Sequence, residues 1–249
     1  IPEPFYANYN GFALASDVNV IPITSKIEDN FALPSIHEFE KKINSKTKAI
    51  LLCNPCNPTG YVYSQEEIIN IANLAKKNDL FIVVDEVYRE FIYTDTKHFS
   101  ILEDEKFSEN AILIDSTSKR YSLCGARVGF IVSKNSEFIE TCLKFALTRL
   151  SPPTLALIAA NHALNSREDY IENVIKEYYK RREVIINELS QIDNIKFSNP
   201  MGAFYSIIKL PIENAEDFAK FLLTDFSYKN QSVMLSPASG FYSSENYGK

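Results

Sequence analysis

Four short apolar runs are the sequence feature that most restricts the fold of this chain. They are residues 49–53, 80–84, 111–114 and 128–132. A continuous apolar run of this length is typical of a strand buried on both faces of a sheet. Between the first two runs, Ser64 is followed by Glu67 and by apolar residues at helical spacing, which predicts a helix that begins at Ser64. Strands that alternate with helices are joined by crossover connections. We therefore expect an α/β fold with three layers, in which helices cover both sides of a mainly parallel sheet.

The second half of the chain is helical in character. Residues 137–189 have almost continuous helical periodicity, with one break at the Ser-Pro-Pro sequence of residues 151–153. The part from Glu172 to Leu189 is long and charged and carries an apolar stripe. A helix of this kind often runs between two domains.

The C-terminal part has the pattern of a small α+β unit. Residues 204–210 and 232–235 have strand character, and residues 215–223 have helical character. We expect a large domain at residues 1–165, an interdomain helix at 166–189 and an incomplete small α+β domain at 190–249.

Composition excludes several classes of partner. The chain has 249 residues, a net charge of -6 and a pI near 5.3, which argues against binding to nucleic acid or to an anionic membrane. Its apolar stretches are shorter than the ~20 residues that span a bilayer. The first six residues lack the pattern of a signal peptide, so the expected location is the cytoplasm. The histidines have no metal-ligand spacing, and no metal site is predicted.

Cys53 and Cys56 have the spacing of a redox motif. Such a pair usually opens a helix, which lowers the pKa of its thiols. Here the pair is followed by Asn57-Pro58-Thr59-Gly60, which is typical of a turn. An α/β domain with a redox site at these two cysteines is therefore a minor alternative.

Polar side chains follow three of the predicted strands. Asn57 follows the first strand, Asp85 ends the second, and Ser116 and Lys119 follow the third. In open α/β sheets, ligands bind outside the carboxyl ends of the strands. We therefore expect these residues to face one crevice.

The residue types at this edge suggest one cofactor. Lys119 can form a Schiff base when its surroundings lower the pKa of its amine. The hydroxyls of Ser116 and Ser118 and the forked guanidinium of Arg127 suit a phosphate group beside that amine. An amine that forms an imine next to a phosphate site indicates pyridoxal phosphate.

Three further residues suit the ring of this cofactor. Asp85 can keep a pyridine nitrogen protonated, which the ring needs in order to accept electrons. Asn57 and Tyr88 can donate hydrogen bonds to the neighbouring phenolate oxygen. Each also has a structural alternative, because Asp85 could be a solvated strand end, Asn57 part of a turn and Tyr88 a packing residue.

Three motifs in this order resemble the class I/II aminotransferases of fold type I. They are Asn-Pro-Cys-Asn-Pro-Thr-Gly at 54–60, Val-Asp-Glu-Val-Tyr at 84–88, and Ser-Thr-Ser-Lys at 116–119 followed by Gly-Ala-Arg-Val-Gly at 125–129. The resemblance implies that Lys119 forms the Schiff base with pyridoxal 5'-phosphate. It also assigns the ring to Asp85, Asn57 and Tyr88, and the phosphate to Ser116, Ser118 and Arg127. Pro4-Phe5-Tyr6 resembles the segment whose aromatic residue stacks on the pyridine, so Tyr6 inherits that role.

The resemblance also implies an activity. It is the transfer of an amino group between an L-amino acid and a 2-oxo acid by a ping-pong mechanism, as in aspartate aminotransferases, in a homodimer. Two alternatives use the same scaffold: a β-lyase or synthase with the same cofactor residues, and a non-catalytic regulatory module that binds pyridoxal phosphate.

The chain departs from the family pattern at both ends. Members usually carry a longer N-terminal part with a phosphate-binding turn at a helix N-terminus. They also carry an arginine that binds the substrate carboxylate near the C-terminus, whereas no arginine follows Arg182 in this sequence. We therefore expect that these residues are part of a longer protein.

Overall fold

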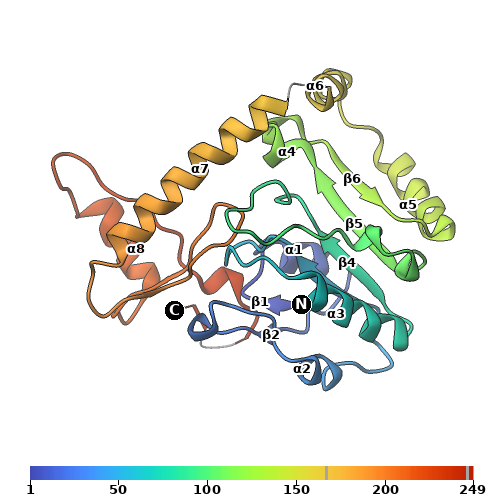
Figure 1. Cartoon of the computed structure of the whole chain (residues 1–249), viewed down its shortest axis with the longest axis horizontal. Coiled ribbons are helices and arrows are strands. Elements are labelled where there is room, and N and C mark those ends of the chain that lie inside the picture. The colour runs from blue at the N-terminus through green and yellow to red at the C-terminus, as the bar shows by residue number, and fades with distance from the viewer. Residues whose placement is uncertain (166–167, 245–246, 249) are drawn as a thin grey trace.

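A four-stranded sheet forms the centre of the computed structural model, which describes residues 1–165, 168–244 and 247–248 (Figure 1). The strands lie in the order β3-β4-β5-β6. β3 pairs with β4 and β4 with β5 in parallel, whereas β6 runs antiparallel to β5. Their bounds are Ala49–Cys53, Phe81–Asp85, Ala111–Ser116 and Gly129–Val132. The expectation of an α/β fold with a mainly parallel sheet is confirmed.

The main core lies between one face of this sheet and α3 (Gln65–Lys77). Ile82 and Val84 of β4 are fully buried there, against apolar residues of α3 such as Ile71. The alternate residue Phe81 points to the other face, where its ring centroid lies 5.5 Å from that of Phe138 in α5 (Ser136–Arg149). Helices therefore pack on both faces of the sheet, as the apolar strands predict.

The N-terminal segment forms a small unit beside the sheet. It contains β1 (Pro2–Glu3), α1 (Asn8–Ala15), β2 (Ile23–Thr24), a 3-10 turn at Ile27–Asp29 and α2 (Ile36–Glu40). β1 and β2 pair in parallel. The fully buried carboxylate of Glu3 accepts hydrogen bonds from Thr24 Oγ1 (2.8 Å) and from the backbone N–H groups of Ser243 (2.9 Å) and Ser244 (3.1 Å). This carboxylate therefore ties the N-terminal strand to the C-terminal segment.

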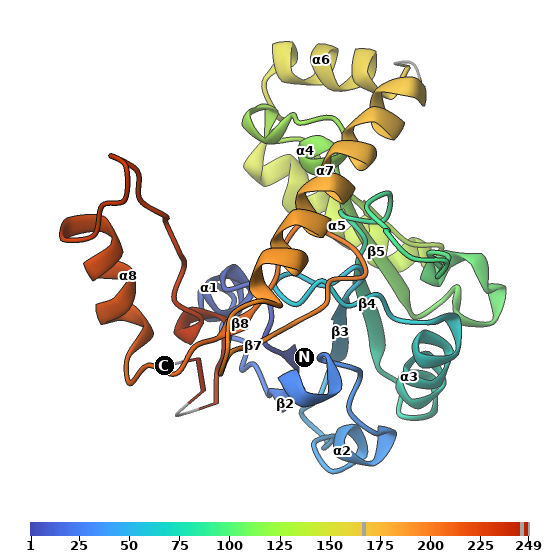
Figure 2. The same ribbon diagram turned by 60° about the vertical axis from the view of Figure 1, so that its left-hand side comes forward.

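The remaining elements follow the sheet in chain order. Most of the Ser-Thr-Ser-Lys motif forms the short helix α4 (Thr117–Arg120), and 3-10 turns lie at Ile101–Glu103, Glu105–Phe107, Cys124–Ala126 and Ser239–Phe241. α6 (Thr154–Leu164) and α7 (Glu168–Leu189) follow α5, and β7 (Lys196–Phe197), β8 (Ile208–Lys209) and α8 (Ala215–Thr224) complete the chain. Figures 1 and 2 show α7 running from α6 towards the β7–β8 pair. The division into domains at residues 165/166 and 189/190 stays a prediction.

Two strand predictions in the C-terminal part are corrected. Residues 204–210 form a strand only at Ile208–Lys209, which pairs with β7. Residues 232–235 are irregular, and the side chain of Met234 is 81% exposed. An apolar run becomes a strand only where another strand supplies hydrogen bonds, and the described residues supply none here. The helix predicted at 215–223 is confirmed as α8, with Asn214 as its N-cap.

The capping box of α3 yields a testable prediction. Ser64 Oγ accepts a hydrogen bond from Glu67 N (3.2 Å), and the Glu67 carboxylate accepts one from Ser64 N (2.7 Å). We expect Ser64→Ala to lower the free energy of unfolding by about 1 kcal/mol, because a helical N–H loses its partner. Urea denaturation followed by circular dichroism measures this loss.

A matched control is Ser35→Ala. Ser35 is the N-cap of α2, but its side chain makes no capping hydrogen bond. We expect this variant to unfold as the wild type does. Equal losses in both variants would contradict the prediction.

Candidate active site

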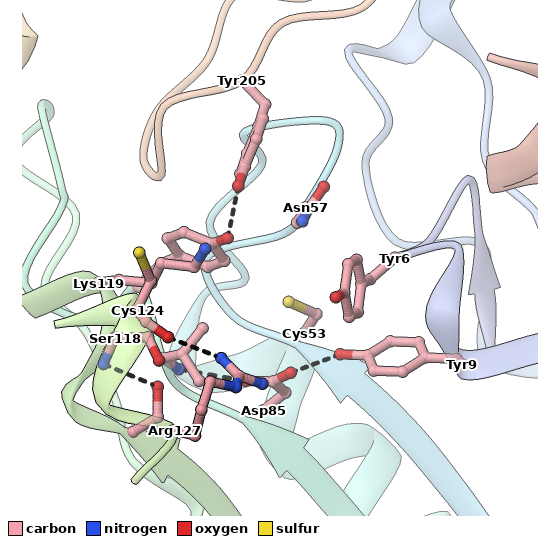
Figure 3. A pocket seen from close by; sticks show the side chains of 13 residues that line it. Tyr6, Tyr9, Cys53, Asn57, Asp85, Ser118, Lys119, Cys124, Arg127 and Tyr205 are labelled. Atoms are coloured by element: carbon pink, nitrogen blue, oxygen red, sulfur yellow. Dashed lines mark hydrogen bonds between the residues drawn. The ribbon is translucent and has the colours of Figure 1, made fainter. Parts of the chain in front are cut away.

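All eight residues that the sequence nominates line one cavity of about 200 Å³ (Figure 3). The cavity is also lined by five residues that the sequence analysis did not assign to the site. The nominated residues are Tyr6, Asn57, Asp85, Tyr88, Ser116, Ser118, Lys119 and Arg127, and the others are Tyr9, Cys53, Val87, Cys124 and Tyr205.

The register of the parallel strands explains this convergence. Cys53, the last residue of β3, lies opposite Asp85, the last residue of β4. Asp85 in turn lies opposite Ile114 in β5, and that strand continues to Ser116. The loops that follow the three strands therefore leave the sheet at the same edge, as ligand sites of open α/β sheets require.

Asn57 lies in a tightly packed turn after β3 and is 7% exposed. Within the turn, Gly60 N donates to Cys56 O (2.9 Å). Gly60 has a φ of +72°, and a Cβ atom at this position would lie 2.3 Å from Cβ of Pro200. The turn interpretation and the cofactor interpretation of this motif are therefore compatible, because the turn presents Asn57 to the cavity.

Asp85 is held by a residue that sequence analysis missed. Its Oδ2 accepts a hydrogen bond of 2.6 Å from Tyr9 Oη, and its Oδ1 accepts one of 3.2 Å from Val87 N. Burial raises the pKa of the Asp85 carboxyl above its usual value, and the two hydrogen bonds oppose this shift. Burial also raises the pKa of Tyr9, so its hydroxyl stays protonated and donates.

Tyr9 comes from α1, outside the sheet, so the rule of strand ends could not place it. The sequence feature that could have indicated Tyr9 is its position three residues after Tyr6, because side chains at this spacing lie close together in a helical turn. Their rings meet edge to face, with centroids 5.5 Å apart. Tyr6 is half-buried and stands beside Asp85 and Cys53 in the cavity (Figure 3).

Lys119 lies in α4, a single turn that one hydrogen bond and two ion pairs hold in place. Ser116 is the N-cap, and its Oγ accepts a hydrogen bond from Ser118 N (3.2 Å). The buried Arg120 makes ion pairs with Glu90 (2.6 Å) and Asp115 (2.9 Å). Lys119 itself lines the cavity, with Nζ 5.8 Å from the ring centroid of Tyr88.

Arg127 is the exposed member of the anion site. Its backbone is in the left-handed region at a φ of +57°, and Nη1 donates to Cys124 O (2.9 Å). Its guanidinium has further N–H donors, because five are available in the fork. With the hydroxyl of Ser118, it forms a group of donors on the same side of the cavity as Lys119 (Figure 3). Ser116, the N-cap of α4, lines the same cavity.

Tyr88 is 3% exposed and lies between Lys119 and Tyr205. The hydroxyls of Tyr88 and Tyr205 form a hydrogen bond of 2.6 Å. Burial raises the pKa of Tyr88, so this phenol remains protonated at neutral pH. Tyr205 lies in the run of residues 204–210 for which the sequence predicts a strand, but its contact with Tyr88 was not foreseen.

The sequence profile of the family described as aminotransferase class I and II matches residues 1–245. The chain belongs to this family. It is 34% identical to an aspartate aminotransferase of Bacillus sp. strain YM-2 over 97% of its own length and 62% of that protein. It is 28% identical to aromatic-amino-acid aminotransferase 2 of Thermococcus litoralis over 97% of the chain and 61% of that protein.

A solved structure supports the same assignment. Aspartate aminotransferase from Thermotoga maritima superposes with a TM-score of 0.86 at 30% identity, over 96% of this chain and 61% of that one. The expected fold of a type I aminotransferase is therefore confirmed. The chain spans about three fifths of the length of the aminotransferases that it matches.

The cavity fits the cofactor expected for an aminotransferase of this fold. It combines an amine for the aldehyde of pyridoxal phosphate and a carboxylate for the ring nitrogen. An amide and a phenol can donate hydrogen bonds to the phenolate oxygen, and a cluster of N–H and O–H donors suits the phosphate. The partly buried Asp85 is suited to a cationic ring nitrogen, because such a partner would restore the ionised carboxylate that burial disfavours.

The two cysteines of the Cys-Asn-Pro-Cys motif do not have the environment of a redox pair. Both are buried free thiols, and Cys53 ends a strand instead of opening a helix. Burial raises the pKa of both thiols, whereas reactive thiols have a lowered pKa. The geometry therefore favours a structural role for Cys56, while Cys53 forms part of the cavity wall.

The raised pKa of Asp85 predicts a change in pH dependence. A carboxyl whose pKa is higher in the folded state stabilises the fold below its unfolded pKa, and this stabilisation is lost as pH rises through the folded pKa. We expect Asp85→Asn to raise Tm of the ligand-free protein at neutral pH, because the amide carries no charge that burial disfavours. The gain should shrink towards about pH 4, where the unfolded carboxyl is half protonated.

Differential scanning calorimetry across this pH range measures the effect. Asp95→Asn is a suitable control, because Asp95 lies in an exposed loop. A gain for Asp85→Asn that does not depend on pH, or a loss at neutral pH, would contradict the prediction.

Proposed function

We propose that the protein containing this chain is a pyridoxal-phosphate-dependent aminotransferase. It would move an amino group between an L-amino acid and a 2-oxo acid by a ping-pong mechanism. The observation that carries this proposal is that Lys119, Asp85 and the hydrogen-bond donors around Arg127, which suit a phosphate, all line one cavity.

Each residue has a role that follows from its chemistry. The bound cofactor supplies an electron sink for the carbon that carries the substrate amino group. Asp85 holds the proton on the ring nitrogen, while Asn57 and Tyr88 donate to the phenolate oxygen. Tyr6 provides an aromatic face for the ring, and Ser116, Ser118 and Arg127 hold the phosphate.

Lys119 is the proposed catalytic residue. Its Nζ would hold the cofactor covalently, and a substrate amino group in its place would leave the Lys119 amine free. The free amine would accept a proton from the substrate α-carbon as a general base and then donate it as a general acid. The fixed turn of α4 keeps Nζ at the cavity wall during both transfers.

The substrate pair is proposed only as a class. Aspartate is supported by the name of the Bacillus relative, and an aromatic amino acid by the name of the Thermococcus relative. Both names fit an enzyme that transfers the α-amino group of an L-amino acid.

We also propose that the protein is a homodimer of the cytoplasm. Large apolar side chains are exposed on α5 and α6, including Phe145 at 70% and Leu155 at 81% exposure. Such surfaces often lie at interfaces between proteins. Among the described residues, every helix is too short or too polar to cross a bilayer.

Replacement of Lys119 tests the catalytic proposal. We expect wild type to bind pyridoxal phosphate through a bond that borohydride can reduce, and Lys119→Ala to lose that bond. Amino transfer should fall at least about a hundredfold, because general acid and base catalysis is removed. Absorbance of the full-length protein with and without amino acids, and mass spectrometry after borohydride treatment, measure both effects.

Lys134→Ala is the matched control, because Lys134 is a partly exposed surface lysine that pairs with Glu105. A reducible bond that persists in Lys119→Ala would overturn the assignment. Release of pyruvate and ammonia, without an aminated form of the cofactor, would favour a β-lyase. Binding without any turnover would favour a regulatory module.

A further inference from the structure

The hydroxyl of Tyr205 lies 2.6 Å from that of Tyr88, on the wall of the cavity. This distance is at the short end of the range for a hydrogen bond between hydroxyls. Figure 3 shows that Tyr205 enters the cavity from a different part of the chain than Lys119 and Ser118. Tyr205 therefore contacts a residue that is expected to contact the cofactor directly.

The backbone fixes the position of the Tyr205 segment. Gly202 N donates to Gly60 O (2.9 Å), in the turn that carries Asn57. Ala203 N donates to Phe91 O (2.9 Å), in the chain that follows Tyr88. A Cβ atom on Gly202 would lie 2.6 Å from Phe91 O, so only glycine fits here. The segment is therefore anchored to both stretches that present donors to the cavity.

Packing alone does not explain the hydroxyl of Tyr205. The neighbouring Phe204 supplies the apolar contact, since its ring stacks on Tyr178 with centroids 4.8 Å apart. The rings of Tyr88 and Tyr205 meet edge to face, 5.5 Å apart, and phenylalanine could make the same contact. Within the described part of the chain, what the oxygen of Tyr205 adds is its hydrogen bond with Tyr88.

We propose that Tyr205 is a positioning residue that donates to Tyr88 and so makes Tyr88 a stronger donor to the phenolate oxygen of the cofactor. A phenol has a single proton. When Tyr88 donates a hydrogen bond to an acceptor in the cavity, its own proton is used there. Tyr205 must then be the donor in the hydrogen bond between the two tyrosines. Consecutive hydrogen bonds of this kind polarise one another. This inference rests on the proposed function.

The pH dependence of the bound cofactor tests the proposal. Hydrogen bonds to an oxygen anion favour the deprotonated form and lower the pH midpoint of the absorbance change that accompanies proton loss. We expect Tyr205→Phe to raise this midpoint by roughly 0.1–0.3 unit, because the polarisation strengthens a neutral hydrogen bond by only about 10–30%. Tyr88→Phe should raise it further, because it removes the direct donor. The groups that titrate around the Tyr88 hydroxyl are Tyr205, Lys119, Cys53 and Asp85, and the first substitution leaves the last three in place.

A double variant shows whether Tyr205 acts on the cofactor through Tyr88, or acts directly or only by stabilising the fold. If Tyr205 acts through Tyr88, the midpoint of Tyr88→Phe/Tyr205→Phe equals that of Tyr88→Phe. The structural control is Tyr93→Phe, which removes the hydrogen bond from Tyr93 Oη to Ala203 O and leaves the pair of hydroxyls intact. We expect the midpoint of this control to equal that of the wild type.

Titrations of the full-length protein with pyridoxal phosphate distinguish this inference from the proposed function. An unchanged midpoint in Tyr205→Phe, an equal shift in Tyr93→Phe, or additive shifts in the double variant would each overturn the role of Tyr205 alone. A wild type that forms no covalent bond with the cofactor would overturn the proposed function and this inference with it.

Discussion

The hydrogen-bonded register of β3, β4 and β5 is the constraint on which the rest of the structure depends. It sets Cys53 beside Asp85, and Asp85 beside Ile114, so that three loops begin at one level of the sheet. A shift of one residue in any pair would turn Asp85 towards the opposite face, because side chains alternate along a strand. The apolar core between the sheet and α3 prevents such a shift, since it would expose Ile82 and Val84. Burial of the core thus determines the position of the polar residues at the strand ends.

The sequence could predict those parts of the fold and site that are determined by residues close together in the chain. The capping box at Ser64 and the bounds of β3 follow from patterns within a few residues, and the structure contains them as expected. β4 lies one residue further along the chain than the predicted run at 80–84. Residues 232–235 show where this logic fails. Their apolar character resembles that of a strand, but a strand also needs a partner with free backbone groups, and no local pattern encodes where that partner lies.

Tyr9 and Tyr205 were missed for a related reason. Each reaches the cavity from an element whose position is set by long-range packing: α1 for Tyr9, and the segment anchored to Gly60 and Phe91 for Tyr205. The family motifs identify residues expected to contact the cofactor, because those residues cluster at strand ends. Groups that act on these residues from elsewhere in the chain carry no such spacing, so only the three-dimensional arrangement reveals them.

These two tyrosines illustrate how the site balances stability against function. Burial disfavours the charged form of Asp85, and a carboxylate without partners in such a place would take up a proton. Tyr9 opposes that tendency with one hydrogen bond, yet Asp85 keeps an environment that a cationic ring nitrogen would complete. Tyr88 is similar, because its hydroxyl already shares a hydrogen bond with that of Tyr205 and can donate to a ligand while Tyr205 supplies the proton of that shared bond. In both pairs a neutral phenol satisfies the buried group without using a full charge, which leaves the stronger interaction for the ligand. A charged partner such as lysine would hold Asp85 more firmly, but it would compete with the ring nitrogen for the same carboxylate.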